Sequence, residues 1–86
     1  MTVLARPSLN NPWHALVLGR AGLDLYPQPN GGKTYEAEGF SADMGGSGGN
    51  IAAAMGRAGA KVALLSAVSD DSVGAFVRQR LTQYHV

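Results

Sequence analysis

The chain has 86 residues, a formal net charge of +1 and no cysteine. A chain of this length forms at most one small domain. Its near-neutral charge gives no reason to expect nucleic acid or an anionic membrane as a partner, and the lack of cysteine excludes disulfides and thiolate metal sites. No apolar run approaches the roughly 20 residues of a membrane-spanning helix.

Residues 1–12 contain one arginine and lack the apolar core of a secretory signal. We therefore expect a poorly ordered leader, a folded region over residues 13–86 and a cytoplasmic location.

The first half of the folded region reads as strands joined by a loop. The apolar run 14–19 predicts a buried strand ending in glycine, and residues 23–26 are expected to extend it. Residues 27–32 are rich in proline, asparagine and glycine and predict a loop. Residues 34–43 mix polar and apolar side chains and predict one or two exposed strands.

The second half predicts helix, strand and helix. Residues 49–57 read as a helix that stops at Gly59, and residues 61–68 as a second buried strand. A final helix begins after Asp70 and Asp71, which are candidate caps. The residues of its apolar face are Val73, Phe76, Val77, Leu81 and Tyr84.

The order strand, excursion, helix, strand, helix predicts an α/β fold with a parallel sheet covered by helices. Two strands and two helices close a core only with difficulty. We therefore expect the N-terminal part of a larger α/β protein, the alternative being a small domain stabilised by self-association.

The most informative segment is Gly45-Gly46-Ser47-Gly48-Gly49-Asn50, which leads directly into an alanine-rich helix. Glycines allow the backbone to pack closely against another group, and Asn50 stands where a helix should begin, able to cap it or to reach a ligand. A flexible linker has a similar composition. The ordered, alanine-rich continuation argues against a linker.

These residues resemble the start of the ribokinase-like (PfkB) carbohydrate kinases. The resemblance covers residues 14–86, and its most specific part is the Gly-Gly-x-Gly-x-Asn-x-Ala core at 45–52. The opening Gly-Arg-x-x-x-Asp-Leu-Tyr at 19–26 is most similar to the 5-dehydro-2-deoxygluconokinase branch, followed by the 2-keto-3-deoxygluconate kinases. Ser69 departs from the family pattern, which usually has glycine there.

The resemblance implies a three-layer α/β fold with a small β lid formed by residues 34–43. Such a lid closes over the sugar and often pairs with the lid of another subunit, so a homodimer is expected. The implied reaction is transfer of the γ-phosphate of ATP, with Mg²⁺, to a hydroxyl of a sugar or keto-sugar acid.

The catalytic aspartate of the family belongs to a downstream Gly-Ala-Gly-Asp motif that these 86 residues lack, and no P-loop pattern is present. The resemblance therefore implies that no catalytic residue lies in this chain. Neither catalysis nor binding of ATP and Mg²⁺ is expected from it alone.

The resemblance also implies a sugar-binding set. Asp24, taken to end the first strand, would accept hydrogen bonds from adjacent hydroxyls, and backbone N–H groups of the glycines would face the sugar. Arg20 is the candidate for recognising a carboxylate. The full set is Arg20, Asp24, Gly45, Gly46, Ser47 and Asn50.

Each of these residues also has a purely structural interpretation. Asp24 could be a turn or cap residue, Asn50 could simply cap the helix, and Arg20 could be a solvated charge or an ion-pair partner. At the level of function, the alternative is a non-catalytic sugar-binding or polyol-binding module, or an interaction module without a ligand.

Overall fold

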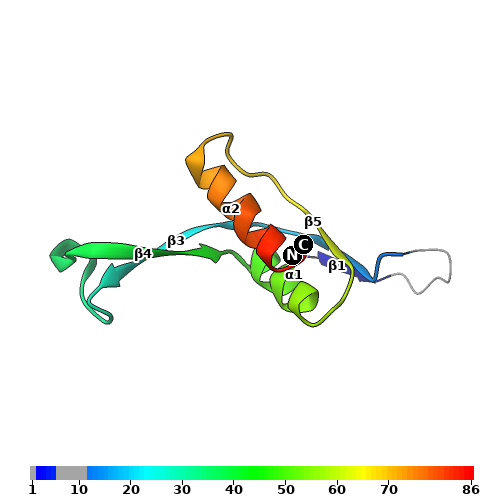
Figure 1. The fold of residues 1–86 in the computed structure, drawn as a ribbon, viewed down its shortest axis with the longest axis horizontal. Helices are drawn as coiled ribbons and strands as arrows, with labels where there is room; N and C mark the ends of the chain where they lie inside the picture. Colours follow the sequence, from blue (N-terminus) through cyan, green and yellow to red (C-terminus); the bar gives the residue numbers. More distant parts are fainter. Residues whose placement is uncertain (1, 6–11) are drawn as a thin grey trace.

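The computed structural model describes residues 2–5 and 12–86 of the chain (Figure 1). The elements follow one another as β1 (Thr2–Ala5), β2 (Ala15–Leu18), β3 (Gly22–Gln28), the 3₁₀ helix η1 (Thr34–Glu36), β4 (Gly39–Gly45), α1 (Ser47–Arg57), β5 (Val62–Leu65) and α2 (Ser72–Gln83).

The main sheet has the strand order β1-β2-β5. Strands β2 and β5 are parallel, with Ala15 opposite Val62, which confirms the predicted parallel sheet. Strand β1 pairs antiparallel with β2 and lies in the segment that we expected to be a poorly ordered leader. The remainder of that predicted leader, residue 1 and residues 6–11, lies outside the described residues, while Pro12 is exposed.

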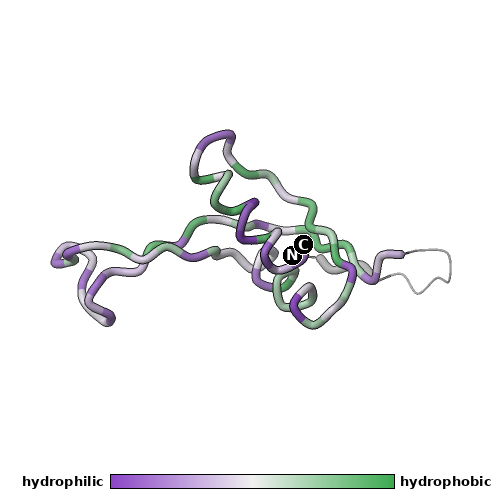
Figure 2. Tube along the Cα trace, viewed as in Figure 1, coloured by the Kyte–Doolittle hydropathy of each residue, from purple (hydrophilic) through white to green (hydrophobic). Residues whose placement is uncertain are grey.

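Helix α1 covers one face of the main sheet. Val17 and Val62 of the sheet are buried against Ala52 of the helix, and Ile51 and Met55 complete this first core. The short alanine side chain lets the helix lie close to the strands. Figure 2 shows the hydrophobic residues concentrated along β2 and β5, where this core forms.

Helix α1 starts at Ser47, two residues earlier than predicted, and ends at Arg57. The glycine stop is confirmed: Gly59 has a φ of +93°, a conformation that favours glycine. The N–H of Ala60 donates to the Met55 carbonyl at 3.0 Å, which closes the end of the helix.

Helix α2 is capped by Asp71, as predicted. The Asp71 carboxylate accepts from the N–H groups of Val73 at 3.0 Å and Gly74 at 3.1 Å. The Ser69 hydroxyl donates to the same oxygen at 2.5 Å, and these bonds lower the pKa of Asp71. Serine at position 69, the departure from the family pattern, therefore supports this cap.

A second core lies between α1, α2 and the base of β4. Val77 of α2 is buried with Met44 and Ala53, and Phe76 packs at its border. Ala53 of α1 faces this core while Ala52 faces the first, so the two alanines join the two cores.

Strands β3 and β4 form a separate two-stranded antiparallel ribbon that projects from the body (Figure 1). The predicted extension of the first strand through residues 23–26 is therefore wrong, because β3 belongs to another sheet than β2. The predicted lid at 34–43 is correct in part: residues 39–43 belong to strand β4, whereas residues 34–36 form the 3₁₀ helix at the tip. The complete lid-like ribbon is made by residues 22–28 and 39–45.

Candidate functional site

The glycine-rich segment forms the junction between the ribbon and α1. Gly46 precedes the helix with a φ of +91°, and a Cβ there would lie 2.6 Å from the Arg20 carbonyl oxygen. A Cβ on Gly48 would lie 2.7 Å from the carbonyl carbon of Gly19. Glycine is required at both positions because the connection between β2 and β3 passes directly over the start of the helix.

The predicted close approach of backbone is thus confirmed, and its partner is this chain's own segment 19–21. The N–H of Gly49 donates to the Arg20 carbonyl at 2.9 Å, and a Cβ on Gly49 would lie 2.9 Å from that of Ala21. The glycine segment therefore fixes the ribbon to the helix. Because the N–H group of Gly49 is already used, any backbone N–H group available to a ligand would lie before Gly49 in the sequence.

Asp24 lies in the middle of β3, and the expectation that it ends the first strand is wrong. Its exposed carboxylate lies over Gly45, where a Cβ would meet the carboxylate carbon and both oxygens at 2.2 Å. Gly45 thus leaves the space that Asp24 occupies. The structure brings these two predicted site residues together.

The ribbon has one polar and one apolar face, because side chains alternate along a strand and directly paired residues share a face. The pairing of Asp24 with Asp43 and of Tyr26 with Ser41 sets the register. The polar face comprises Gly22, Asp24, Tyr26, Gln28, Gly39, Ser41, Asp43 and Gly45. The apolar face comprises Leu23, Leu25, Pro27, Phe40, Ala42 and Met44.

Hydrogen bonds order the polar face. The Tyr26 hydroxyl donates to Oδ2 of Asp24 at 3.2 Å, and the Gln28 amide donates to the Ser41 hydroxyl at 3.0 Å. The nearby Asp24 carboxylate raises the pKa of Tyr26, since it opposes a second negative charge and binds the protonated phenol. Asp43 accepts at 2.8 Å from the N–H of Met44.

Asn50 lies in the first turn of α1 and does not cap it, because the cap position is Gly46 and has no side-chain cap bond. Asn50 is exposed, and its N–H donates to the Gly46 carbonyl at 3.0 Å. It borders a hollow of about 210 Å³ between β4, α1 and α2. The lining residues are Asp43, Met44, Asn50, Ala53, Ala54, Arg57 and Tyr84.

This hollow combines opposite charges with an aromatic ring. The guanidinium of Arg57 lies 5.5 Å from the centre of the Tyr84 ring, and Asp43 stands on the ribbon side. Asp24 does not line it, although Asp43, its partner across the strands, does. That Asp24 and Asn50 share one sugar pocket stays a prediction.

The other two predicted site residues are placed by the junction. The side chains of Arg20 and Ser47 are both exposed, while the backbone of Arg20 packs on the glycine segment. The proposed recognition of a carboxylate by Arg20 thus stays a prediction.

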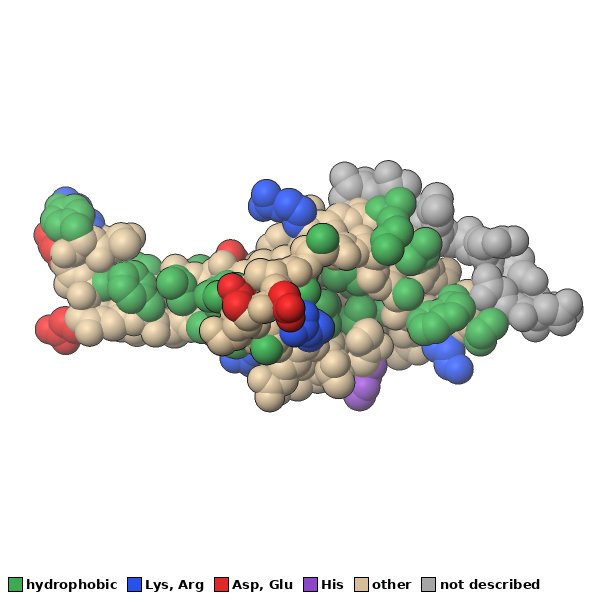
Figure 3. All heavy atoms as spheres, turned by 90° about the horizontal axis from the view of Figure 1, so that it is seen from above, with side chains coloured by type: hydrophobic (Ala, Val, Ile, Leu, Met, Phe, Trp, Pro, Cys, Tyr) green, Lys and Arg blue, Asp and Glu red, His purple; other side chains and the backbone are tan. Residues whose placement is uncertain are grey.

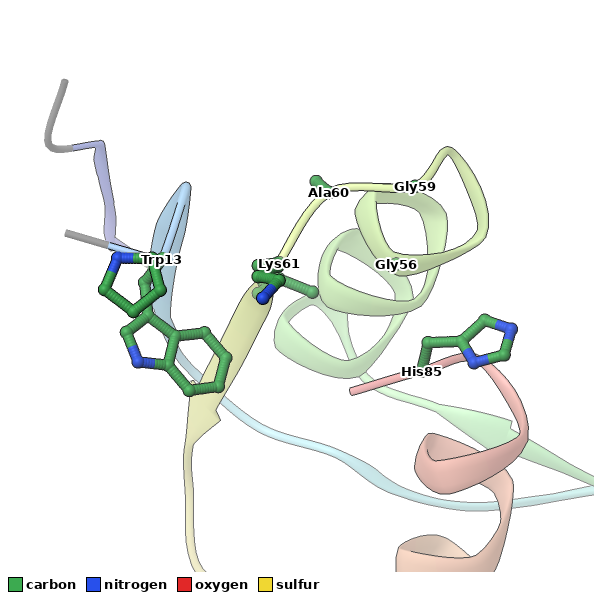
Figure 4. Close-up of a pocket in the computed structure, with 8 residues that line it drawn as sticks. Trp13, Gly56, Gly59, Ala60, Lys61 and His85 are labelled. Atoms are coloured by element: carbon green, nitrogen blue, oxygen red, sulfur yellow. The ribbon is translucent and has the colours of Figure 1, made fainter. Parts of the chain in front are cut away.

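A larger hollow of about 500 Å³ lies at the opposite end of the sheet (Figure 4). It is bordered by Trp13, Lys61 and Val62, where β2 and β5 begin, and by Gly59 and His85. Ligands of parallel α/β sheets bind where the strands end rather than where they begin. The ribbon side of the molecule is therefore the better candidate.

Two residues of the polar face, Tyr26 and Asp43, were not among the predicted site residues. Polar residues stand at every second position from Asp24 to Gln28, a pattern that indicates a strand with one solvent-exposed face. This pattern could have indicated that Tyr26 lies on the same face as Asp24. The placement of Asp43 beside Asp24 depends on the pairing register, which the sequence does not specify locally.

Within residues 2–5 and 12–86, no helix is long and apolar enough to cross a membrane. The same residues contain no group of three or more histidine, aspartate or glutamate side chains arranged to hold a metal ion.

Comparisons with known proteins agree with this architecture. Residues 14–86 match the model of the pfkB family of carbohydrate kinases. The chain is 40% identical over 74 residues to a 5-dehydro-2-deoxygluconokinase of Photobacterium profundum, and 41% identical over 66 residues to one of Clostridium tetani. These alignments cover 86% and 77% of this chain.

A solved structure of a PfkB protein from Polaromonas sp. JS666 superposes with a TM-score of 0.72 and 28% identity over 80% of this chain. Taken with the family match, this shows that the chain belongs to the pfkB family of carbohydrate kinases and has the α/β architecture of a ribokinase-like fold. It spans 22% and 20% of the two curated relatives and 23% of the solved structure.

Proposed function

We propose that these residues form the N-terminal, sugar-binding portion of an ATP-dependent carbohydrate kinase. The observation that supports this most is the Asp24 carboxylate, which lies over Gly45 on the polar face of the ribbon. An exposed carboxylate can accept hydrogen bonds from two neighbouring hydroxyls of a sugar, and such charge-assisted bonds are strong.

The proposed acceptor is a sugar or keto-sugar acid. The first candidate is 5-dehydro-2-deoxygluconate, because both curated relatives carry the name of a kinase for it. In this proposal Asp24 and Asn50 bind hydroxyl or carbonyl groups. Backbone N–H groups around Gly45, Gly46 and Ser47 add donors, and Arg20 recognises the acid group.

ATP and Mg²⁺ would be held elsewhere in the complete kinase. We do not expect this segment to hold either group, because the downstream Gly-Ala-Gly-Asp motif of the family is absent from these 86 residues. The role proposed for this segment is to orient one acceptor hydroxyl for phosphoryl transfer. We do not expect the segment alone to catalyse, and the cytoplasm is the proposed location.

A second copy of the chain is the proposed partner of the ribbon. Leu25 and Phe40 of the apolar face are 56% and 48% exposed. Figure 3 shows hydrophobic side chains along the ribbon on the side of the molecule that carries α2. Exposed apolar side chains on a strand pair favour burial against another copy, which makes a homodimer through this lid the proposed assembly.

The proposed function is tested in the complete kinase that carries this segment, with ATP, Mg²⁺ and 5-dehydro-2-deoxygluconate. Asp24→Ala should raise the acceptor KM about tenfold or more, because a charged hydrogen-bond partner is lost. Asp70→Ala removes the same charge from an exposed position ahead of α2 and should leave KM unchanged.

The outcomes separate the candidate functions. Binding of sugars without phosphoryl transfer would favour the non-catalytic binding module. An unchanged acceptor KM in the Asp24→Ala enzyme would remove Asp24 from the sugar site and contradict the proposal.

A further inference from the structure

The polar face of the ribbon contains a side-chain contact that bears on the orientation of Asp24. Tyr26 lies two residues further along β3, on the same face, and its hydroxyl donates to Oδ2 of Asp24 at 3.2 Å. Both side chains are exposed, with Tyr26 at 50%. Burial therefore does not hold the carboxylate in place, and the hydrogen bond from Tyr26 is the side-chain contact that restrains it.

The surroundings of Asp24 make such a restraint necessary. Asp43 stands directly opposite on the neighbouring strand, and like charges in a cross-strand pair repel each other. Gly45 has no side chain that could hold the carboxylate, which lies in the space left by the missing Cβ. Without a donor on the ribbon, the aspartate side chain would be free to turn away from Asp43.

Tyr26 can supply that donor at any pH near neutrality. The pKa of its phenol is raised from an already high ordinary value, chiefly by the charge of Asp24 and by the hydrogen bond to it, with a smaller contribution from Asp43. The hydroxyl therefore stays protonated and keeps donating. One carboxylate oxygen is engaged and the other, Oδ1, is left to accept from a ligand.

We propose that Tyr26 is a positioning residue of the acceptor site: it fixes the Asp24 carboxylate so that hydroxyl groups of the sugar, rather than its acid group, bind at the polar face of the ribbon. This inference rests on the proposed function. The register places two carboxylates and no basic side chain on this face, so it repels a carboxylate and favours uncharged hydroxyl donors. A carboxylate fixed before binding loses less conformational freedom when the sugar arrives.

The test is a double-mutant cycle in the complete kinase, with 5-dehydro-2-deoxygluconate as the acceptor. Tyr26→Phe removes only the hydroxyl and should raise the acceptor KM roughly threefold to tenfold, with kcat little changed. In the Asp24→Ala background the same substitution should have no further effect on KM, because the group that it positions is absent.

Tyr35→Phe is the matched control. Tyr35 lies in η1 at the tip of the ribbon, and its ring contact with the Lys33 ammonium at 5.7 Å survives in phenylalanine. This variant should leave KM unchanged in both backgrounds. An ultraviolet titration adds a readout independent of activity: Asp24→Asn should lower the ionisation midpoint of one tyrosine, and that same transition should be missing in Tyr26→Phe.

Two results would overturn the inference. The first is an acceptor KM that Tyr26→Phe leaves unchanged. The second is an equal rise in KM with and without Asp24, which would mean that the Tyr26 hydroxyl acts independently of the carboxylate. Failure of the proposed function is distinguishable, because then Asp24→Ala alone would not affect KM.

Discussion

At the scale of single residues, the position of Asp24 depends on a glycine in the neighbouring strand. The Asp24 carboxylate occupies the place that a side chain at Gly45 would take. The carboxylate proposed to bind the sugar is thus positioned by the absence of another side chain. The glycine at 45 has a role distinct from that of Gly46 and Gly48, which make room for the backbone of residues 19–20.

Gly45→Ala should therefore displace the Asp24 carboxylate without unfolding the ribbon, because an aspartate side chain can rotate away. We expect the acceptor KM to rise about tenfold, similar to the loss of one charged hydrogen bond.

Gly22→Ala is the matched control. Gly22 pairs directly with Gly45 across the ribbon, and a Cβ there has no neighbour within 4 Å. Its KM should stay within about twofold of the wild type, since the two substitutions change strand propensity alike. Equal KM values for both variants would show that the orientation of Asp24 over Gly45 has no part in acceptor binding.

At the scale of elements, the β3–β4 ribbon has two faces with different consequences. The polar face contains Asp24 and Tyr26. The apolar face is buried at its base, where Met44 belongs to the second core, and is exposed further out, at Leu25 and Phe40. The apolar face therefore continues a core surface into solvent, which is the physical reason to expect association there.

Phe40→Glu should weaken self-association. Burying a large apolar side chain stabilises an interface by about 1.5–3 kcal/mol, so a charge at this position should raise the dimer dissociation constant tenfold or more. Ser41→Glu adds the same charge to the adjacent residue on the polar face and should leave association unchanged. Sedimentation equilibrium measures both. A wild-type chain that stays monomeric at tens of micromolar would refute association through the ribbon.

The elements that the sequence predicts best are those defined by local signals. The β2–α1–β5–α2 order, the glycine stop at Gly59 and the cap at Asp71 all follow from apolar periodicity and from end signals within a few residues. Of the two roles that the sequence allows Asn50, capping is excluded, because Gly46 occupies the cap position and Asn50 lies within the first turn.

The sequence predicts the two strands of the ribbon and their pairing less well, for a physical reason. Residues 23–26 have the apolar pattern of a strand whichever sheet they join, and their partner, residues 41–44, follows only after the long connection 29–38. Register between such segments depends on the turn and on long-range packing. The contact of Tyr26 with Asp24 and the pairing of Asp24 with Asp43 could therefore be recognised only in three dimensions.

At the scale of the whole molecule, the described residues leave much apolar surface uncovered. On the sheet face opposite α1, Leu16 is 36% exposed and Leu65 is 60% exposed. The molecule measures 53 × 26 × 21 Å, with the ribbon extending from its body (Figure 1). The family relatives are about five times longer than the matched segment, which is consistent with further elements packing on this face.

The central claim is that Asp24 and the polar face of the ribbon bind the hydroxyl groups of the sugar. The most direct test is a crystal structure of the complete kinase with 5-dehydro-2-deoxygluconate bound. We expect at least one acceptor hydroxyl within about 3.2 Å of an Asp24 oxygen, with the hydrogen bond from Tyr26 to Asp24 retained. A sugar bound elsewhere, with Asp24 in contact only with solvent, would contradict it.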